Sequence, residues 1–317
     1  ADVVTITAAD GTVTTQQTLG GDDTLVIEAG GTLTVGSDAI SATGTGNTIT
    51  NSGTIKATSF DGIDSRGANA IITNSGSINA EFSGIDSRGA NAIITNSGTI
   101  TSTYGDGIYS SGANAIITNS GSITAADDDA DDDGIQSVSI NAIITNSGTI
   151  TSTYGDGISS TGANTIITNS GIINGGDNGI DSSGDDTTIT NSGNITSTSG
   201  DGIKSQGANA IITNSGTVTA ADSGIVSSGT NATITNSGSI TANGVASGGI
   251  VSSGTNAIIT NSGSITGATG IYSQGTNVTI TNSGTITGTN YAILGGASDN
   301  LTLNLLKGSQ LMGKIDL

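Results

Sequence analysis

The residues of this chain that could do chemistry are carboxylates, and many of them lie in one acidic run. Six of the seven residues from position 127 to position 133 are aspartates. Carboxylates this close together repel one another unless a cation neutralises them, and clustered oxygen ligands suit a hard ion such as Ca²⁺. The aspartates of the acidic run are Asp127, Asp128, Asp129, Asp131, Asp132 and Asp133.

Two further aspartates extend the acidic run into a predicted column of carboxylates. Asp133 stands two residues before Ile135, and Asp106 and Asp156 hold the same place before an isoleucine in the flanking repeats. We expect these carboxylates to lie beside one another and to form, with the acidic run, a candidate Ca²⁺ site. The spacing is not that of an EF-hand, so a solvated acidic loop is the alternative. No cofactor is required, and Ca²⁺ is the one that the residues could accept.

The remaining composition argues against catalysis. The chain has no histidine and no cysteine, and 6 lysines and arginines stand against 26 aspartates and glutamates. The usual general base, the thiolate nucleophile and the commonest metal ligands are therefore missing. We expect no enzyme, and a polysaccharide-active enzyme is the least favoured function. The formal net charge of −20 repels phosphates, so no nucleic-acid partner is expected.

An internal repeat must position these residues, and its most regular feature is the tripeptide NSG. Each copy has Ile two residues before the Asn and Ile or Val four residues after it, and a further Ile stands 11 residues before each Asn. The Asn residues of the motif are Asn51, Asn74, Asn96, Asn119, Asn146, Asn169, Asn191, Asn214, Asn236, Asn261 and Asn282.

Three short apolar segments per repeat, separated by Gly, Asn and Ser, predict one coil of a parallel β-solenoid. We predict an all-β, single-stranded parallel β-helix with three short strands and about 22–23 residues per coil, and roughly 12 coils plus capping ends. The motif Asn is expected in a left-handed turn and in a structural ladder along the stack. The predicted divisions are a cap over 1–24, repeats over 25–300, and a final coil or the start of a linker over 301–317.

Five isoleucines on consecutive predicted coils should point outward, because each stands between two inward positions. Such a stripe predicts lateral self-association, so copies of the same chain are the first expected partner. The alternative is that isoleucine stands there only for its β-propensity. The residues of the stripe are Ile71, Ile93, Ile116, Ile143 and Ile166.

Other outward residues offer a weaker sign of a glycan partner. The tetrapeptide DSRG recurs at 64–67 and 86–89, where opposite charges are expected to pair on the surface, with polysaccharide contact as the alternative. Tyr104 and Tyr154 hold equivalent loop positions, but coils between them separate the rings, so we do not expect the two to form a sugar-stacking platform.

The repeated NSGTI and NSGSI units, the opening GGDDTLVIEAGGTLTVGSDAI and the ending LTLNLLKGSQLMGKIDL resemble the passenger domains of bacterial type V autotransporters. The resemblance covers essentially the whole chain. It implies a right-handed parallel β-helix, secretion through the outer membrane, and display on the cell surface in adhesion, aggregation or biofilm formation. No catalytic motif of the family matches a position here.

We therefore expect an extracellular structural or adhesive β-solenoid on a bacterial surface, with copies of itself and a cell-surface glycan or protein as partners. No apolar run approaches the roughly 18 residues of a membrane span, so direct membrane insertion of this segment is not expected. The alternative is a subunit of an extracellular filament or surface layer. Its solenoid ends would stack head to tail with the help of Ca²⁺.

Overall fold

The computed structural model describes residues 1–126, 131–296 and 300–317. It is an all-β parallel β-solenoid of about 13 turns with three strands per coil, which confirms the predicted fold. The described residues contain one short helix, the 3₁₀ turn η1 (Ala8–Asp10). The chain divides into two units, Ala1–Gly162 and Ala163–Leu317, and each is described by itself.

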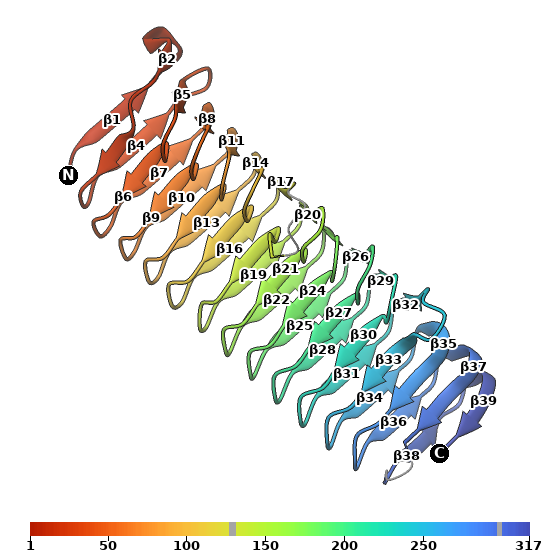
Figure 1. Ribbon diagram of the computed structural model, residues 1–317. Helices are drawn as coiled ribbons and strands as arrows, with labels where there is room; N and C mark the ends of the chain where they lie inside the picture. The colour runs from red at the N-terminus through yellow and green to blue at the C-terminus, as the bar shows by residue number, and fades with distance from the viewer. Residues whose placement is uncertain (127–130, 297–299) are drawn as a thin grey trace. The chain divides into compact units, whose positions relative to one another are not determined.

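In the first unit each coil contributes one strand to each of three rows, and every strand pairs in parallel with its counterpart in the next coil (Figure 1). Row 1 comprises β1 (Val3–Ile6), β4 (Thr24–Ile27), β7 (Thr48–Asn51), β10 (Ile71–Asn74), β13 (Ile93–Asn96), β16 (Ile116–Asn119) and β19 (Ile143–Asn146). Row 2 comprises β2 (Thr12–Val13), β5 (Thr32–Val35), β8 (Thr54–Ala57), β11 (Ser77–Ala80), β14 (Thr99–Ser102), β17 (Ser122–Ala125) and β20 (Thr149–Ser152). Row 3 comprises β3 (Gln17–Leu19), β6 (Ile40–Ala42), β9 (Ile63–Ser65), β12 (Ile85–Ser87), β15 (Ile108–Ser110), β18 (Ile135–Ser137) and β21 (Ile158–Ser160).

The second unit repeats this plan, except that its last coils join rows 2 and 3 into single long strands. Row 1 comprises β22 (Ile166–Asn169), β25 (Thr188–Asn191), β28 (Ile211–Asn214), β31 (Thr233–Asn236), β34 (Ile258–Asn261), β36 (Thr279–Asn282) and β38 (Thr302–Leu305). Row 2 comprises β23 (Ile172–Gly175), β26 (Asn194–Ser197), β29 (Thr217–Ala220) and β32 (Ser239–Ala242), and row 3 comprises β24 (Ile180–Ser182), β27 (Ile203–Ser205), β30 (Ile225–Ser227) and β33 (Gly248–Ser252). The joined strands are β35 (Ser264–Ser273), β37 (Thr285–Gly295) and β39 (Gln310–Asp316).

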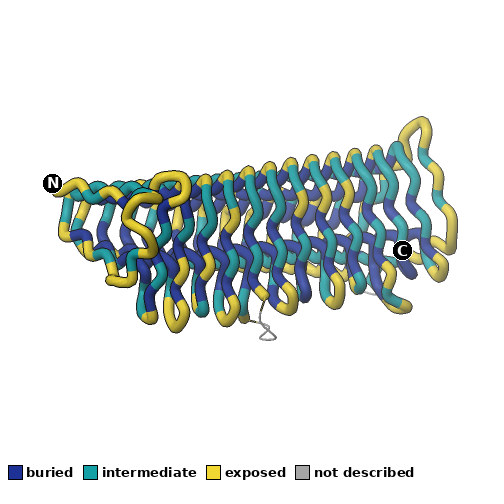
Figure 2. The backbone as a smooth tube through the Cα atoms, turned by 90° about the horizontal axis from the view of Figure 1, so that it is seen from above, coloured by how far each residue is buried: buried dark blue, intermediate teal, exposed yellow. Residues whose placement is uncertain are grey.

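The core of each unit is a column of isoleucines, because side chains alternate between the two faces of a strand. In β10, Ile72 and Asn74 point inward and are buried, whereas Ile71 is exposed. Parallel register places like residues side by side, as where Ile72 lies opposite Ile94. Figure 2 shows the same pattern in each unit, with buried strand residues inside and exposed residues mainly at the turns. Each buried isoleucine contributes about 1.5–3 kcal/mol relative to an exposed one.

The motif Asn forms a buried amide ladder rather than a left-handed turn, so the predicted conformation is wrong. Asn51 Nδ2 donates to Asn74 Oδ1 at 2.7 Å, and Asn74 donates to Asn96 in the same way. The left-handed conformation belongs to a second, exposed series that includes Asn69 and Asn91. The sequence pattern did not separate the two series, because Asn suits both a turn and an amide ladder.

The glycine of NSG is required by the close approach of neighbouring coils. A Cβ placed on Gly98 would collide with the carbonyl oxygen of Gly76 in the preceding coil. The chain therefore turns at this corner without a side chain between the coils, and only glycine allows that approach.

A third inward column runs through row 3 and carries serine. In both units, hydroxyls of this column are buried without a hydrogen-bond partner, which is unusual for a protein interior. Ala42 holds the same place in β6. The serines concerned are Ser65, Ser87, Ser137, Ser160, Ser205, Ser227, Ser252 and Ser273.

Candidate functional site

The structure places Asp106, Asp133 and Asp156 in one column in the first unit. Each stands just before a row 3 strand, where like residues of successive coils are stacked. The backbone N–H of Asp133 donates to Asp106 Oδ1 at 2.8 Å, and that of Asp156 donates to Asp133 Oδ1 at 2.7 Å. The carboxylates of Asp106 and Asp133 therefore accept hydrogen bonds from the backbone of the next coil and stabilise this corner of the solenoid.

Burial is the main influence on how these carboxyls titrate. Asp106 and Asp133 are 7% and 3% exposed. Burial raises the pKa of Asp106 to about 7, and the nearby Asp132 and Asp86 carboxylates act in the same direction. Burial, followed by the Asp156 carboxylate, raises the pKa of Asp133 to about 8. The two groups can thus change charge within the neutral pH range.

The column extends toward the N-terminus through residues that the sequence analysis missed. The backbone N–H of Asp61 donates to Asp38 Oδ1 at 3.2 Å, and that of Ser83 donates to Asp61 Oδ1 at 2.9 Å. Burial is the first cause that raises the pKa of Asp61 to about 6, followed by the Asp86 carboxylate. Asp38 and Asp61 stand two residues before the row 3 isoleucine of their coils, which is the signal that could have found them.

The acidic run does not assemble into a metal centre within the part of the chain that the structure describes. Asp127, Asp128 and Asp129 lie outside the described residues. Among the residues that are described, no group of three or more carboxylates, histidines or cysteines could hold a metal ion. Asp131 is exposed and Asp132 is half-buried beside the column. The Ca²⁺ site stays a prediction.

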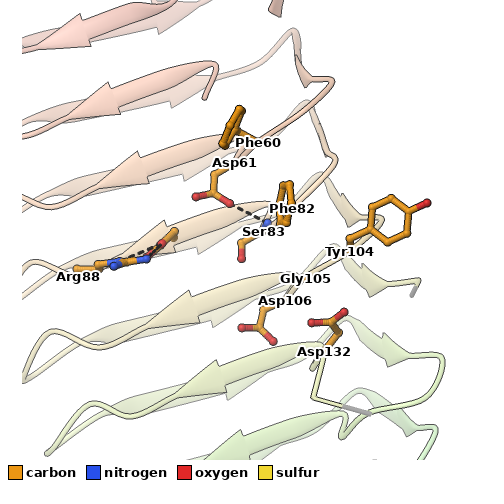
Figure 3. A pocket seen from close by; sticks show the side chains of 10 residues that line it. Phe60, Asp61, Phe82, Ser83, Arg88, Tyr104, Gly105, Asp106 and Asp132 are labelled. Atoms are coloured by element: carbon orange, nitrogen blue, oxygen red, sulfur yellow. Dashed lines mark hydrogen bonds and ion pairs between the residues drawn. The ribbon is translucent and has the colours of Figure 1, made fainter. Parts of the chain in front are cut away.

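A hollow of about 340 Å³ opens beside this column in the first unit. Figure 3 shows Asp61 beside the rings of Phe60 and Phe82, Arg88 away from the rings, and Asp106 and Asp132 on the coils below. Its main lining residues are Phe60, Phe82, Tyr104, Asp61, Asp106, Asp132, Asp86 and Arg88.

The aromatic side of the hollow carries one ring from each of three successive coils. The ring centroids of Phe60 and Phe82 are 6.0 Å apart, with an angle of 31° between the rings. Tyr104 follows on the next coil, where its backbone N–H donates to the carbonyl oxygen of Glu81 at 2.7 Å. Tyr154 is not among the lining residues, so Tyr104 shares the hollow with Phe60 and Phe82 rather than with its sequence equivalent.

The opposite side of the hollow carries a charged pair within one coil. Nε and Nη2 of Arg88 donate to the carboxylate of Asp86, with Nη2 at 2.6 Å from Oδ2. Asp86 is buried and Arg88 is half exposed. Arg66 and Asp64 make the same kind of pair one coil earlier, at 2.9 Å. The opposite charges pair along the strand and not between coils.

Four residues of the isoleucine stripe form a continuous row on the outer face of the first unit. Ile71, Ile93, Ile116 and Ile143 lie opposite one another on hydrogen-bonded neighbouring strands, and their exposures range from 37% to 43%. We call these four residues the isoleucine ladder. Ile166 belongs to the second unit, where its partner in the row is Thr188.

Comparison of the chain with protein-family models, with curated proteins and with solved structures finds no match. A search of the described residues for a helix long and apolar enough to cross a membrane also finds none.

Proposed function

We propose that this chain is an adhesive, self-associating β-solenoid displayed on a bacterial surface, as the passenger part of a type V autotransporter. The observation that supports the proposal is the isoleucine ladder. Four large apolar side chains stand on one outer face although the core already buries an isoleucine from every strand of row 1 in these coils. A contiguous apolar strip of this kind favours protein contact.

A second copy of the chain is the partner that fits the ladder best. Neighbouring strands are about 4.8 Å apart, so an identical ladder presents isoleucines at the same interval and the two rows can interlock. Such a contact uses the same surface on both copies and closes as a pair. The formal net charge of −20 opposes close approach, so we expect association to strengthen with salt.

The test replaces two residues of the ladder by threonine. Thr48 holds the equivalent place in β7, opposite Ile71, so the fold accepts threonine there. We expect the variant Ile93→Thr/Ile116→Thr to raise the dissociation constant of self-association at least tenfold in sedimentation velocity. Beads coated with this variant should clump less than beads coated with the parent chain.

The matched control is Ile211→Thr/Ile258→Thr in the second unit. These isoleucines are at least as exposed as Ile93 and Ile116, but each lies between threonines. The control should associate like the parent chain. Equal loss in the two variants, or no association in the parent chain at any concentration, would refute the proposal.

A second candidate function is the filament or surface-layer subunit, and exposed apolar residues of the last coil favour it. Leu305, Leu306 and Met312 are about half exposed on β38, the turn after it, and β39. Electron microscopy with millimolar Ca²⁺ and then with chelator tests this candidate and the Ca²⁺ site together. Regular fibres that dissolve in chelator would support both, whereas separate particles in both conditions would exclude the autonomous filament.

A further inference from the structure

Aromatic residues are rare in this chain, and three of the seven line one hollow. The sequence has 2 phenylalanines, 5 tyrosines and no tryptophan. Both phenylalanines and Tyr104 line the hollow of the first unit, with 52%, 47% and 50% of Phe60, Phe82 and Tyr104 exposed. A solenoid core does not require exposed rings, and the second unit builds the same coils without phenylalanine. The rings therefore form a surface for a ligand rather than part of the core.

The polar groups across the hollow are suited to hydroxyls. Asp61 and Asp106 each use one carboxylate oxygen, Oδ1, to accept a backbone N–H. Arg88 is held in place by Asp86 and has N–H donors beyond those that the pair uses. A fixed aromatic face opposite fixed acceptors and donors is the arrangement that orients a small ligand.

We infer that this hollow binds a sugar ring of a neutral glycan. The apolar face of the ring would pack on Phe82 and Tyr104, and its hydroxyls would bond to Asp61, Asp106 and Arg88. The volume of about 340 Å³ lies at the lower end of the 300–1,000 Å³ of small-molecule sites, which fits a single ring of a longer chain.

The arginine and the hydrogen bonds already made by the carboxylates favour a neutral ligand over a cation such as a lysine-rich peptide. Arg88 lines the hollow and places a positive charge there. One carboxylate oxygen of Asp61 and one of Asp106 already accept a backbone N–H, so each residue leaves a single acceptor at the hollow. Separate acceptors beside an arginine suit the spaced hydroxyls of a neutral ring, whereas the arginine repels a cation.

The inference goes beyond the proposed self-association, because it uses a different surface and a different partner. The probes are neutral hexasaccharides of glucose, galactose and mannose, tested against the whole chain by saturation-transfer NMR and by calorimetry. Pentalysine serves as the cationic probe. We expect at least one hexasaccharide to bind and pentalysine not to compete with it.

The chain itself supplies substitutions that its fold accepts. Tyr104 lies in TSTYGDGI and Ser199 in TSTSGDGI, so Tyr104→Ser copies a natural coil. Phe82→Asp copies Asp222 in the same way, because SINAEFSGI and TVTAADSGI align without a gap. The double variant Phe82→Asp/Tyr104→Ser should weaken hexasaccharide binding at least tenfold, and the matched control Tyr154→Ser should bind like the parent chain.

These variants separate the two ligand classes and the two proposals. Phe82→Asp adds negative charge, so it would strengthen the binding of a cation while it removes a stacking surface for a sugar. Binding of pentalysine alone, no binding of any hexasaccharide, or equal binding by the double variant and the control would overturn the inference. Sedimentation of the same variants should show unchanged self-association. A failure of the glycan inference would therefore not contradict the proposed self-association through the isoleucine ladder.

Discussion

The two units have the same interior and different outer faces. In the first unit the outward position that begins each row 1 strand carries isoleucine in four successive coils, from Ile71 to Ile143. In the second unit the same position alternates between isoleucine and threonine, from Ile166 to Thr279. Isoleucine and threonine are both β-branched, so both satisfy the strand and only the surface changes.

The carboxylate column differs between the units in a similar way. Asp106, Asp133 and Asp156 are successive in the first unit. In the second unit Asn178 and Ser223 flank Asp201, and their neutral side chains accept the corresponding hydrogen bonds from the backbone N–H groups of Asp201 and Gly248. The backbone needs only an oxygen acceptor at this corner, so the residue that supplies the oxygen can be charged or neutral. The features that could recognise a partner are thus concentrated in the first unit.

The largest effect should come from the feature that the units share. Asn119→Ala and Asn214→Ala each remove a ladder amide, so one neighbouring Asn loses an acceptor of its Nδ2 and the other loses the donor to its Oδ1. Because an unsatisfied buried polar group costs about 1–3 kcal/mol, each variant should lower the free energy of unfolding by about 2–5 kcal/mol. Urea unfolding followed by circular dichroism measures this. A large difference between the two variants would contradict the equivalence of the cores.

The next effect concerns pH and should separate the units. The pKa values of Asp106 and Asp133 are raised to about 7 and about 8, so the folded chain holds protons that the unfolded chain has lost. The free energy of unfolding should therefore fall as pH rises from about 4 to about 8, by an amount on the order of 2–5 kcal/mol. Urea unfolding at pH 5 and pH 8 measures the difference.

The variant Asp133→Asn tests the cause of that pH dependence, because it gives the first unit a neutral member like Asn178. It should flatten the fall in stability between pH 5 and pH 8. The control Asp222→Asn changes an exposed carboxylate of the second unit that stands outside the buried column. Equal slopes in the parent chain and in Asp133→Asn would show that the buried column does not govern stability.

A smaller effect should follow from giving the second unit an isoleucine ladder. The variant Thr188→Ile/Thr233→Ile makes isoleucine continuous from Ile166 to Ile258. The added apolar surface should lower the dissociation constant of self-association about tenfold in sedimentation velocity. The control is Thr190→Ile/Thr235→Ile, which adds two isoleucines to the parallel outward row but leaves Thr213 between them. A tenfold gain in both variants would mean that any added isoleucine suffices.

The smallest effect concerns the buried serines. Ser137→Ala and Ser227→Ala each remove a buried hydroxyl that has no partner, and Ala42 shows that the column accepts alanine. The free energy of unfolding should stay level or rise by up to about 1 kcal/mol in each variant. A loss above 1 kcal/mol in urea unfolding would reveal a hydrogen bond that the structure lacks.

The fold could be predicted because the spacing of the isoleucines in each repeat specifies the core of the solenoid. Each inward isoleucine recurs at a constant distance from the motif Asn, and a coil can bury it only by stacking on a neighbour. The outward direction of Ile93 followed from the same alternation, since side chains on a strand point to opposite faces. Periodicity of 2 within a strand and about 22 between coils was enough for both.

The candidate site could be predicted only in part. The column of Asp106, Asp133 and Asp156 followed from their common distance to isoleucine. The hollow did not, because the places of Phe82 and Tyr104, each eight residues after a motif Asn, do not show that their rings line one hollow with Phe60. Aligning the repeats by residue type pairs Tyr104 with Tyr154, which is not among the residues that line the hollow.

The sequence by itself determined the coil, its inward isoleucines and the outward stripe, because these depend on spacing along the chain. Only the tertiary structure decided which Asn forms the buried ladder and how buried each aspartate is. It also decided which aromatic rings face one hollow. These properties depend on atoms from neighbouring coils, and turns of variable length set their alignment, so no single repeat contains the information.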